Sequence, residues 1–196
     1  MVYNDDTYYF LKLITNRRVK ILFVLLMPLC LFAQAQKFSE YEVKAAFLEK
    51  FTRFVEWPAE AHMEDVNKPF VIGIMGENPF NSILEKMYAN QKIKNKKVEI
   101  RYISVLEDVK NCNLLFITQS KNNRVDQIQY YLKNLPILTV CDDIRYSKKG
   151  VQIMLFVESN HVYFEIDQNA VKLSGLYMNS LLLKMSKTIN TKEEKQ

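Results

Sequence analysis

Two adjacent carboxylates, Asp142 and Asp143, directly follow the apolar segment 136–141 (PILTVC), which is typical of a buried strand. Paired carboxylates can perform acid–base chemistry or bind a cation when they face each other. Neighbouring residues of a chain rarely do so, and Asp at the end of a strand also serves in turns and caps. The pair therefore marks either a site at this edge of the sheet or an ordinary turn.

Two glycines lie at the end of another predicted strand, in the segment 69–76 (PFVIGIMG). At the carboxyl ends of parallel strands, a turn of this kind can hold a ligand. As a phosphate-binding signal the pattern is weak, and an ordinary tight turn explains it more simply. If the chain binds a small ligand, we expect Gly73, Gly76 and Asp142 to line the pocket.

The sequence lacks the motifs of the common catalytic and metal sites. It contains no Walker, GxGxxG or GxSxG motif, and its two histidines, His62 and His161, have no partner at metal-ligand spacing. The formal net charge of +5 is too small to indicate a nucleic-acid partner. We predict a protein that is not an enzyme and that holds no metal or cofactor.

The first 35 residues have the pattern of an export signal. A basic stretch, 17–20, precedes the apolar run 21–32, and Ala33-Gln34-Ala35 supplies the small residues of a cleavage site. The run is short for a membrane-spanning helix, which needs roughly 20 apolar residues. We expect a periplasmic protein with a signal peptide over 1–35 that is cleaved near Ala35, a folded domain over 36–190 and a frayed charged tail over 191–196.

The elements that must position these groups begin with the segment 41–58 (YEVKAAFLEKFTRFVEWP). It is predicted to form an amphipathic helix that ends at Trp57, with one apolar side made by Val43, Phe47, Phe51, Phe54 and Trp57. Lys50 is expected near the middle of that apolar side and Lys44 on its flank. Each lysine must reach solvent, pair with an acid, or meet a negative group of a partner.

Apolar strands alternate with helices along the rest of the chain. We expect strands over 69–76, 98–104, 113–118 and 136–141, with helices over 78–90, 106–110 and 123–134 and a solvated lysine-rich turn over 92–97. This alternation indicates a mainly parallel central sheet with helices on both faces. Two runs joined at 158–160 predict a C-terminal antiparallel hairpin. Asp167 is the expected N-cap of a last helix, whose packing face holds Met178, Leu181, Leu182, Met185 and Ile189, with Gly175 as a break. The predicted fold class is a single-domain α/β sandwich.

Cys112 and Cys141 remain after cleavage, and an exported protein could join them in a disulfide. In the predicted sheet, however, Cys112 precedes the third strand and Cys141 ends the fourth, so that the thiols lie roughly 20 Å apart. A disulfide requires Cα atoms within about 7 Å of each other. We therefore predict two buried thiols and no bridge between Cys112 and Cys141.

Four segments together resemble the YfiR family in their order and spacing: 43–58 (VKAAFLEKFTRFVEWP), 69–80 (PFVIGIMGENPF), 137–143 (ILTVCDD) and 162–185 (VYFEIDQNAVKLSGLYMNSLLLKM). YfiR-type proteins are periplasmic repressors of a membrane diguanylate cyclase, and an outer-membrane lipoprotein relieves the repression. The resemblance implies a dimeric, non-enzymatic regulator of cyclic di-GMP signalling that binds the periplasmic part of an inner-membrane sensor, either a cyclase or a histidine kinase. The well-known member has two disulfides, and Cys112 and Cys141 match one half of each. Because their partner cysteines are absent near Gly73 and over 147–150, redox control is not implied here.

The candidate partner contacts lie on the first helix and in the loop after the fourth strand. They are Lys44, Lys50, Arg53, Trp57, Asp142, Asp143 and Arg145. Trp and Arg are favoured anchors at interfaces, although a single Trp after a core helix also serves as a core plug. The alternative function is a stand-alone periplasmic small-ligand-binding protein. An exported hydrolase is disfavoured, because the sequence offers no evident nucleophile and base.

Overall fold

The structure, a computed structural model, describes residues 38–118, 125–146 and 149–187. All of these residues except Phe38 belong to one unit of the chain, which begins at Ser39. The predicted signal peptide over 1–35 and the predicted tail over 191–196 lie outside the described residues.

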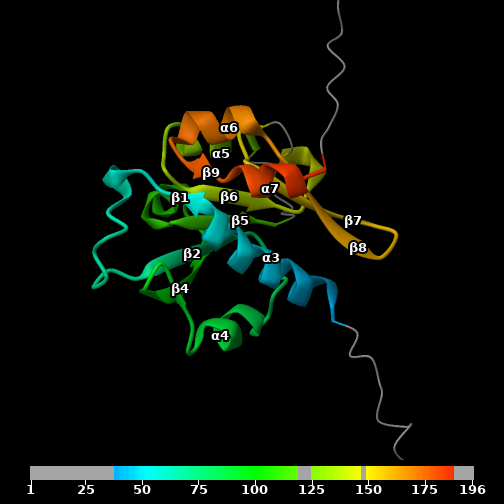
Figure 1. Cartoon of the computed structure of the whole chain (residues 1–196), viewed down its shortest axis with the longest axis horizontal. Coiled ribbons are helices and arrows are strands. Elements are labelled where there is room, and N and C mark those ends of the chain that lie inside the picture. The colour runs from blue at the N-terminus through cyan, green and yellow to red at the C-terminus, as the bar shows by residue number, and fades with distance from the viewer. Residues whose placement is uncertain (1–37, 119–124, 147–148, 188–196) are drawn as a thin grey trace, which may run out of the picture. The chain divides into compact units, whose positions relative to one another are not determined.

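A seven-stranded sheet forms the centre of the described unit, in the order β3-β4-β2-β5-β6-β7-β8 (Figure 1). The five inner strands are parallel, whereas β3 and β8 are antiparallel to their neighbours at the two edges. The strands are β2 (Phe70–Met75), β3 (Lys92–Ile93), β4 (Lys96–Ile103), β5 (Leu114–Ile117), β6 (Leu138–Cys141), β7 (Ile153–Glu158) and β8 (His161–Ile166). This topology confirms the predicted α/β class, the mainly parallel sheet and the C-terminal hairpin.

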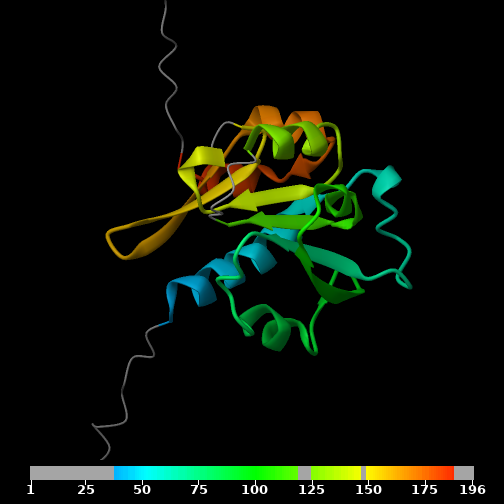
Figure 2. The same cartoon turned by 180° about the vertical axis from the view of Figure 1, so that it is seen from behind.

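Helices and short 3-10 turns connect the strands. The helices are α3 (Glu40–Phe54), α4 (Ile83–Tyr88), α5 (Val125–Leu132), α6 (Gln168–Ser174) and α7 (Ser180–Met185), and the 3-10 turns are η2 (Ala59–Ala61), η3 (Leu106–Asn111) and η4 (Ile144–Tyr146). α3 crosses the face of the sheet that is in front in Figure 1, and α5 is in front in the view from behind (Figure 2). Helices therefore cover both faces, as the sequence predicts.

Side chains that alternate along the strands supply two separate cores. Ile72, Ile74 and Phe116 point to the face that α3 covers and pack with Leu48 and Phe51 of that helix. On the opposite face, residues such as Val71, Leu115 and Ile117 pack with η3 and α5. This two-sided burial explains why the inner strands read as continuous apolar runs.

The start of α3 is fixed by a capping box in which Ser39 and Glu42 satisfy each other's backbone N–H groups. The predicted helix end at Trp57 is wrong, because α3 stops at Phe54. Val55 and Glu56 form strand β1 and pair with Met178 and Tyr177 of β9 (Tyr177–Met178), in a small second sheet. This long-range pairing outweighs the local preference for helix.

The buried face of α3 is rotated relative to the prediction. Its buried residues are Lys44, Ala45, Leu48, Phe51 and Thr52, whereas Phe47 and Phe54 are only partly buried. Lys44 is therefore part of the buried face, whereas Lys50, which is expected near the middle of that face, is exposed. The two lysines have exchanged the environments that the sequence predicts for them.

The lysine-rich turn over 92–97 differs from the solvated loop that is expected. Lys92 and Ile93 form strand β3, which pairs with the start of β4. Lys96 is 2% exposed and its ammonium donates to the backbone carbonyls of Asp65 and Lys68. A lysine thus holds the long loop before β2 against the sheet edge.

Two predicted helices are shorter in the structure. The helix expected over 78–90 begins at Ile83, because the chain first makes a turn in which Asn81 has a positive φ of 50°. The last helix is divided: α6 begins after its predicted N-cap, Asp167, and ends at Gly175, whose φ of 71° is typical of a helix C-cap. The break predicted at Gly175 is confirmed, and α7 follows as a separate helix.

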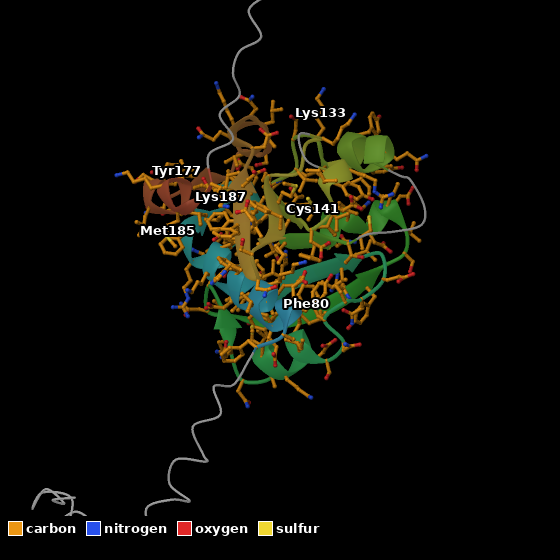
Figure 3. The ribbon with its side chains drawn as sticks, turned by 90° about the vertical axis from the view of Figure 1, so that its right-hand side faces the viewer. Phe80, Lys133, Cys141, Tyr177, Met185 and Lys187 are labelled. Carbon is orange, nitrogen blue, oxygen red and sulfur yellow. The ribbon has the colours of Figure 1, made fainter. Side chains whose placement is uncertain are left out.

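The face predicted for the last helix is only half buried. Met178 and Leu182 are buried, whereas Leu181 and Met185 are 51% and 53% exposed. Tyr177, Met185 and Lys187 lie together on one side of the unit, as Figure 3 shows. The C-terminal part of the chain therefore presents apolar side chains at the surface.

Candidate functional site

α3 spans one face of the sheet and is attached at both ends. At its start, Lys44 meets Asp142, which directly follows β6, and beyond its end the Trp57 indole N–H donates to the carbonyl oxygen of Asn113, directly before β5, at 3.3 Å. Since β5 and β6 are parallel, these two contacts lie at opposite ends of the strands. The predicted partner contacts are therefore divided between two places and do not form one cluster.

A buried ionic cluster forms at the start of α3. The Lys44 ammonium lies 2.8 Å from Asp142 Oδ2 and 2.6 Å from Glu40 Oε1, and its nitrogen is 4.4 Å from the centre of the Tyr41 ring. The Tyr41 hydroxyl also donates to Asp142 Oδ2, at 2.9 Å. The side chains of Lys44 and Asp142 are 4% and 5% exposed. Of the three alternatives for Lys44, the structure therefore shows pairing with acids of its own chain.

The electrostatics of this cluster favour the charged form of Lys44 and the neutral form of Tyr41. Burial acts to lower the pKa of Lys44, but the hydrogen bonds to Asp142 and Glu40 outweigh burial and raise that pKa. Burial and the neighbouring Asp142 carboxylate raise the pKa of Tyr41, so the phenol stays protonated and acts as a donor. The cluster therefore attaches the start of α3 to the carboxyl end of strand β6.

Asp143 has a different partner from Asp142. Its carboxylate accepts from the Arg145 backbone N–H at 2.9 Å and from the Arg145 guanidinium at 2.5 to 3.1 Å. These hydrogen bonds lower the pKa of Asp143. Because the two carboxylates point to separate cations, they do not form an acid–base pair.

The other predicted contacts on the first helix lie at the surface or support the core. Lys50 is exposed, and Arg53, also exposed, pairs with Glu49 at 2.6 Å. Trp57 is half-buried and its ring meets Phe70 edge to face at 5.5 Å. Lys50 and Arg53 are accessible to a partner, whereas Trp57 acts largely as a core plug.

The two predicted pocket glycines allow close packing of the chain. A Cβ atom on Gly73 would lie 2.5 Å from the Cys112 thiol sulphur, which occupies that space together with Ile103 and Leu115. Gly76 has a φ of 105°, and a Cβ there would lie 2.6 Å from the Thr118 hydroxyl. A ligand pocket lined by Gly73, Gly76 and Asp142 stays a prediction.

Both cysteines of the unit are free and buried. Cys141 lies opposite Ile117 at the end of β5, whereas Cys112 precedes the start of that strand. The two thiols are therefore at opposite ends of the parallel strands. Cys141 is completely buried, and its position is labelled in Figure 3. Burial raises the pKa of Cys112 to about 11 and that of Cys141 to about 12. Neither is activated as a nucleophile.

Within 38–118, 125–146 and 149–187, no group of three or more His, Cys, Asp or Glu side chains is placed to hold a metal ion. The helices of the same ranges include none that is long and apolar enough to cross a membrane. These two findings apply to the described residues alone.

Two parts of the site have no counterpart among the sequence predictions. The first is the role of Glu40 and Tyr41 in the cluster, for which the i,i+4 spacing of Glu40 and Lys44 is the available signal. The second is the exposure of Tyr177, Leu181 and Met185 in the C-terminal segment, which contacts α3. Together with the exposed Lys50 and Arg53 of α3, which are among the predicted contacts, we call these residues the α3–α7 face. α3 and α7 are in contact, and Tyr177 pairs with Glu56 just beyond α3. No local pattern predicts that face, because it depends on the β1–β9 pairing.

A family model described as YfiR/HmsC-like matches residues 41–187, which is nearly the whole of the described unit. The chain belongs to the YfiR/HmsC-like family. The YfiR-type family comprises periplasmic regulators of diguanylate cyclase signalling, and it is regulatory rather than catalytic. The family resemblance inferred from the four sequence segments is thereby confirmed.

Two other comparisons are weaker. The aspartate carbamoyltransferase catalytic subunit of Wigglesworthia glossinidia brevipalpis is 26% identical over 111 residues, which is 53% of this chain and 36% of that protein. This chain therefore spans about a third of that relative's length. A conserved domain protein from Vibrio cholerae O1 biovar El Tor str. N16961 has a solved structure that aligns with a TM-score of 0.45 and 11% identity, covering 66% of this chain and 59% of that one.

Proposed function

We propose that this YfiR/HmsC-like protein is exported to the periplasm by a cleaved signal peptide and represses a membrane signalling protein. The target is the periplasmic sensor region of an inner-membrane diguanylate cyclase or, in a second version, of a histidine kinase. The family match over 41–187 carries the proposal. As in the family resemblance, the protein acts as a homodimer and an outer-membrane lipoprotein relieves the repression.

The α3–α7 face supports a role in protein binding. It combines exposed apolar side chains, Tyr177, Leu181 and Met185, with the cations Lys50 and Arg53 on the adjacent helix. Contiguous exposed apolar groups on a soluble domain are typical of interaction sites, and Arg and Tyr are frequent anchors. Among the other contacts predicted from sequence, the side chains of Lys44, Asp142 and Asp143 are buried, whereas that of Arg145 is accessible.

The mechanism follows from binding one state of the sensor more tightly than the other. A ligand moves a two-state equilibrium only by its difference in affinity for the two states. A difference of about 5.5 kcal/mol changes a receptor from almost fully active to almost fully inactive. Repression therefore requires no chemistry, in agreement with the regulatory nature of the family.

Deletion and complementation test the proposal. We expect deletion of the gene to raise cyclic di-GMP in its host, or the output of a kinase, and expression of the full chain in trans to restore the low level. A tagged chain should retain an inner-membrane cyclase or kinase from solubilised membranes. An unchanged output together with no retained sensor would reject the proposal.

Met185→Asp and Val105→Asp form a matched pair for the α3–α7 face. Both replace an exposed apolar side chain by a charge, but Val105 lies in the segment that precedes η3. We expect Met185→Asp to lose repression and retention of the sensor, and Val105→Asp to keep both. Equal behaviour of the two variants would show that the sensor binds elsewhere.

A further inference from the structure

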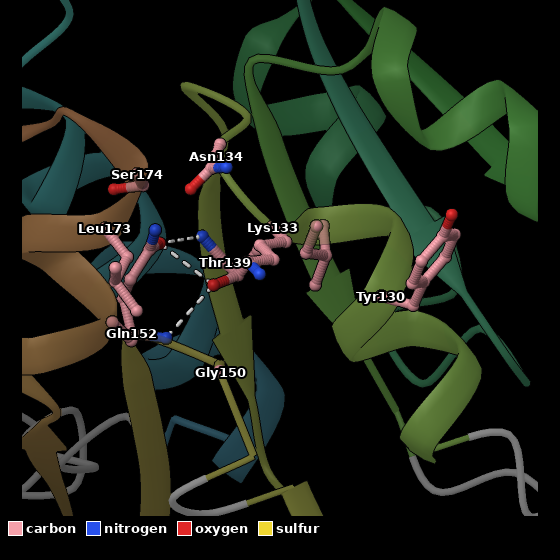
Figure 4. Close-up of a pocket in the computed structure, with 10 residues that line it drawn as sticks. Tyr130, Lys133, Asn134, Thr139, Gly150, Gln152, Leu173 and Ser174 are labelled. Atoms are coloured by element: carbon pink, nitrogen blue, oxygen red, sulfur yellow. Dashed lines mark hydrogen bonds between the residues drawn. The ribbon is translucent and has the colours of Figure 1, made fainter.

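A pocket of about 350 Å³ lies between α5 and α6, where β6 and β7 begin (Figure 4). Leu132, Ala170 and Leu173 supply its apolar wall, and Lys133, Thr139 and Gln152 supply polar groups. Its volume is at the lower end of the range of small-molecule sites, roughly 300 to 1,000 Å³. This pocket is distinct from the ionic cluster at Lys44 and from the α3–α7 face.

The Gln152 side chain at the base of this pocket is only 3% exposed. Its amide oxygen accepts from the Thr139 backbone N–H at 2.5 Å and from the Thr139 hydroxyl at 2.9 Å. A backbone N–H can only donate, so the atom that faces it must be the oxygen. The orientation of the amide is therefore determined, and its NH2 group is on the other side.

That NH2 group has no hydrogen-bond partner among the residues that the structure describes. The NH2 nitrogen is not among the fully buried atoms that lack a partner, because it faces the pocket, where water or a ligand can supply the acceptor. The Gln152 oxygen serves as the acceptor for the Thr139 backbone N–H at the start of the β6–β7 pairing. This role requires an acceptor at position 152, but it does not require the NH2 group. Figure 4 shows the Gln152 amide between α6 and the start of β6, where the pocket opens.

The other polar groups of the pocket limit what can bind. Ser174 already donates its hydroxyl to the Val171 carbonyl. Lys133 is exposed, and no described residue pairs with its ammonium. Tyr130 and Asn134 also line the pocket and can both donate and accept, whereas the Gln152 NH2 and the Lys133 ammonium can only donate, and the second of these carries a positive charge. A ligand must therefore bring an acceptor, and an anionic acceptor fits both groups.

We propose that the α5–α6 pocket binds a small carboxylate that has an apolar body. The carboxylate accepts from the Gln152 NH2 and lies near the Lys133 ammonium, while the apolar body packs against Leu132, Ala170 and Leu173. The volume suits a ligand with one aromatic ring or a short acyl chain. Binding at this pocket goes beyond the proposed function, because it does not depend on the identity of the sensor.

Protein-observed NMR titration of the domain tests the pocket directly. The probes are phenylacetate and hexanoate, with 2-phenylethanol as the uncharged counterpart of phenylacetate. We expect saturable shifts at Thr139, Gln152, Ala170 and Leu173, including the Gln152 side-chain NH2 resonances, for both carboxylates. The alcohol should bind at least roughly tenfold more weakly, because it lacks the charged acceptor.

Three variants distinguish binding in this pocket from binding elsewhere on the domain. Gln152→Glu keeps an oxygen for the Thr139 N–H but removes the NH2 group and adds a repelling charge, so affinity for phenylacetate should fall at least roughly tenfold. Leu173→Trp fills the pocket from an exposed position and should abolish binding. Leu181→Trp makes the same change at an exposed position of α7 and should leave binding intact.

The proposal fails if neither carboxylate gives saturable shifts at these residues, which would leave water as the partner of Gln152. It also fails if Leu173→Trp binds phenylacetate as the unmodified domain does. Should Gln152→Glu unfold, the Leu173→Trp and Leu181→Trp pair still decides the question. Repression by the Leu173→Trp variant distinguishes this proposal from the proposed function, since a sensor that binds the α3–α7 face is unaffected by loss of the pocket.

Discussion

Lys44 of α3 and Asp142 at the end of β6 form an ion pair of 2.8 Å whose two side chains are almost completely buried, although 98 positions separate them in the chain. A buried charge is tolerated only when it is paired and hydrogen-bonded. Glu40 and Tyr41 supply the further hydrogen bonds. The start of α3 is therefore held to the sheet by polar contacts, whereas its middle is held by apolar packing.

We expect Lys44→Met to destabilise the domain by about 3 to 5 kcal/mol, because it leaves the Asp142 carboxylate buried without its cation. The double variant Lys44→Met/Asp142→Asn should recover much of this loss. Lys50→Met, at an exposed position of the same helix, should change the free energy of unfolding by less than about 0.5 kcal/mol. Urea unfolding of the four proteins measures these values. Equal effects at Lys44 and Lys50 would contradict the buried pair.

The Asp143–Arg145 pair should give the domain a defined response to acid. The folded-state pKa of Asp143 lies below its ordinary value of 3.8, so the unfolded state binds the proton more readily. The resulting stability is present in full above that ordinary value and is lost as the pH falls through the folded-state pKa. Asp143→Asn should therefore be less stable than the unmodified domain at neutral pH, and the two stabilities should converge as the pH falls through the folded-state pKa of Asp143.

Free energies of unfolding between about pH 2 and 7 test this convergence. A constant difference between Asp143→Asn and the unmodified domain over this pH range would mean that the pair does not couple protonation to folding.

Lys96 should be the one lysine of the segment 92–97 whose loss is costly. Lys96→Met leaves the Asp65 and Lys68 carbonyls without their donor and should cost about 1 to 3 kcal/mol. Lys97→Met changes an exposed neighbour and should be close to neutral. Amide hydrogen exchange over residues 62–68 should also become faster in Lys96→Met alone. Unaltered exchange there would show that Lys96 does not anchor this loop.

Gly73→Cys should create a disulfide with Cys112. A Cβ on Gly73 points at the Cys112 sulphur, so a sulphur added there lies within bonding reach after a small adjustment. Under oxidising conditions the intact mass should show the loss of two hydrogens, and reduction should lower the melting temperature. Gly73→Ala adds the same Cβ without a sulphur and should cost about 1 to 3 kcal/mol through overpacking. An oxidised Gly73→Cys protein without this mass loss would contradict the geometry of β2 and Cys112.

The sheet could be predicted from sequence because its inner strands are buried on both faces and read as apolar runs bounded by polar or turn residues. The boundaries of α3 could not, because the pairing of Val55 with Met178 is a tertiary contact. The burial of Lys44 and the exposure of Lys50 also differ from the prediction. The reason is that the predicted apolar side of the helix is defined mainly by its aromatic residues. The face that packs instead contains the small residues Ala45 and Thr52, which allow close approach to the sheet.

The candidate site could be predicted in part. The types and positions of Lys44, Asp142 and the exposed cations of α3 single them out, but the pairing of Lys44 with Asp142 joins positions that no local pattern relates. Leu181 and Met185 are predicted on a packing face, because their spacing suits a helix, whereas the division at Gly175 changes what that helix contacts. Gln152 has no signal in the sequence, since its free NH2 group follows from one hydrogen bond to Thr139.

The pairing of β1 with β9 also has a kinetic consequence. It joins the residues that follow the first described helix to residues near the end of the described chain, so this contact has a very large sequence separation. Contacts of large separation form late, because the loop between them must first be closed at an entropic cost. A chain that is delivered from its N-terminus can build α3 and the parallel strands early, yet it completes this second sheet only after Tyr177 and Met178 have arrived. β1 is therefore made early, but its pairing must wait for nearly the last residues of the domain.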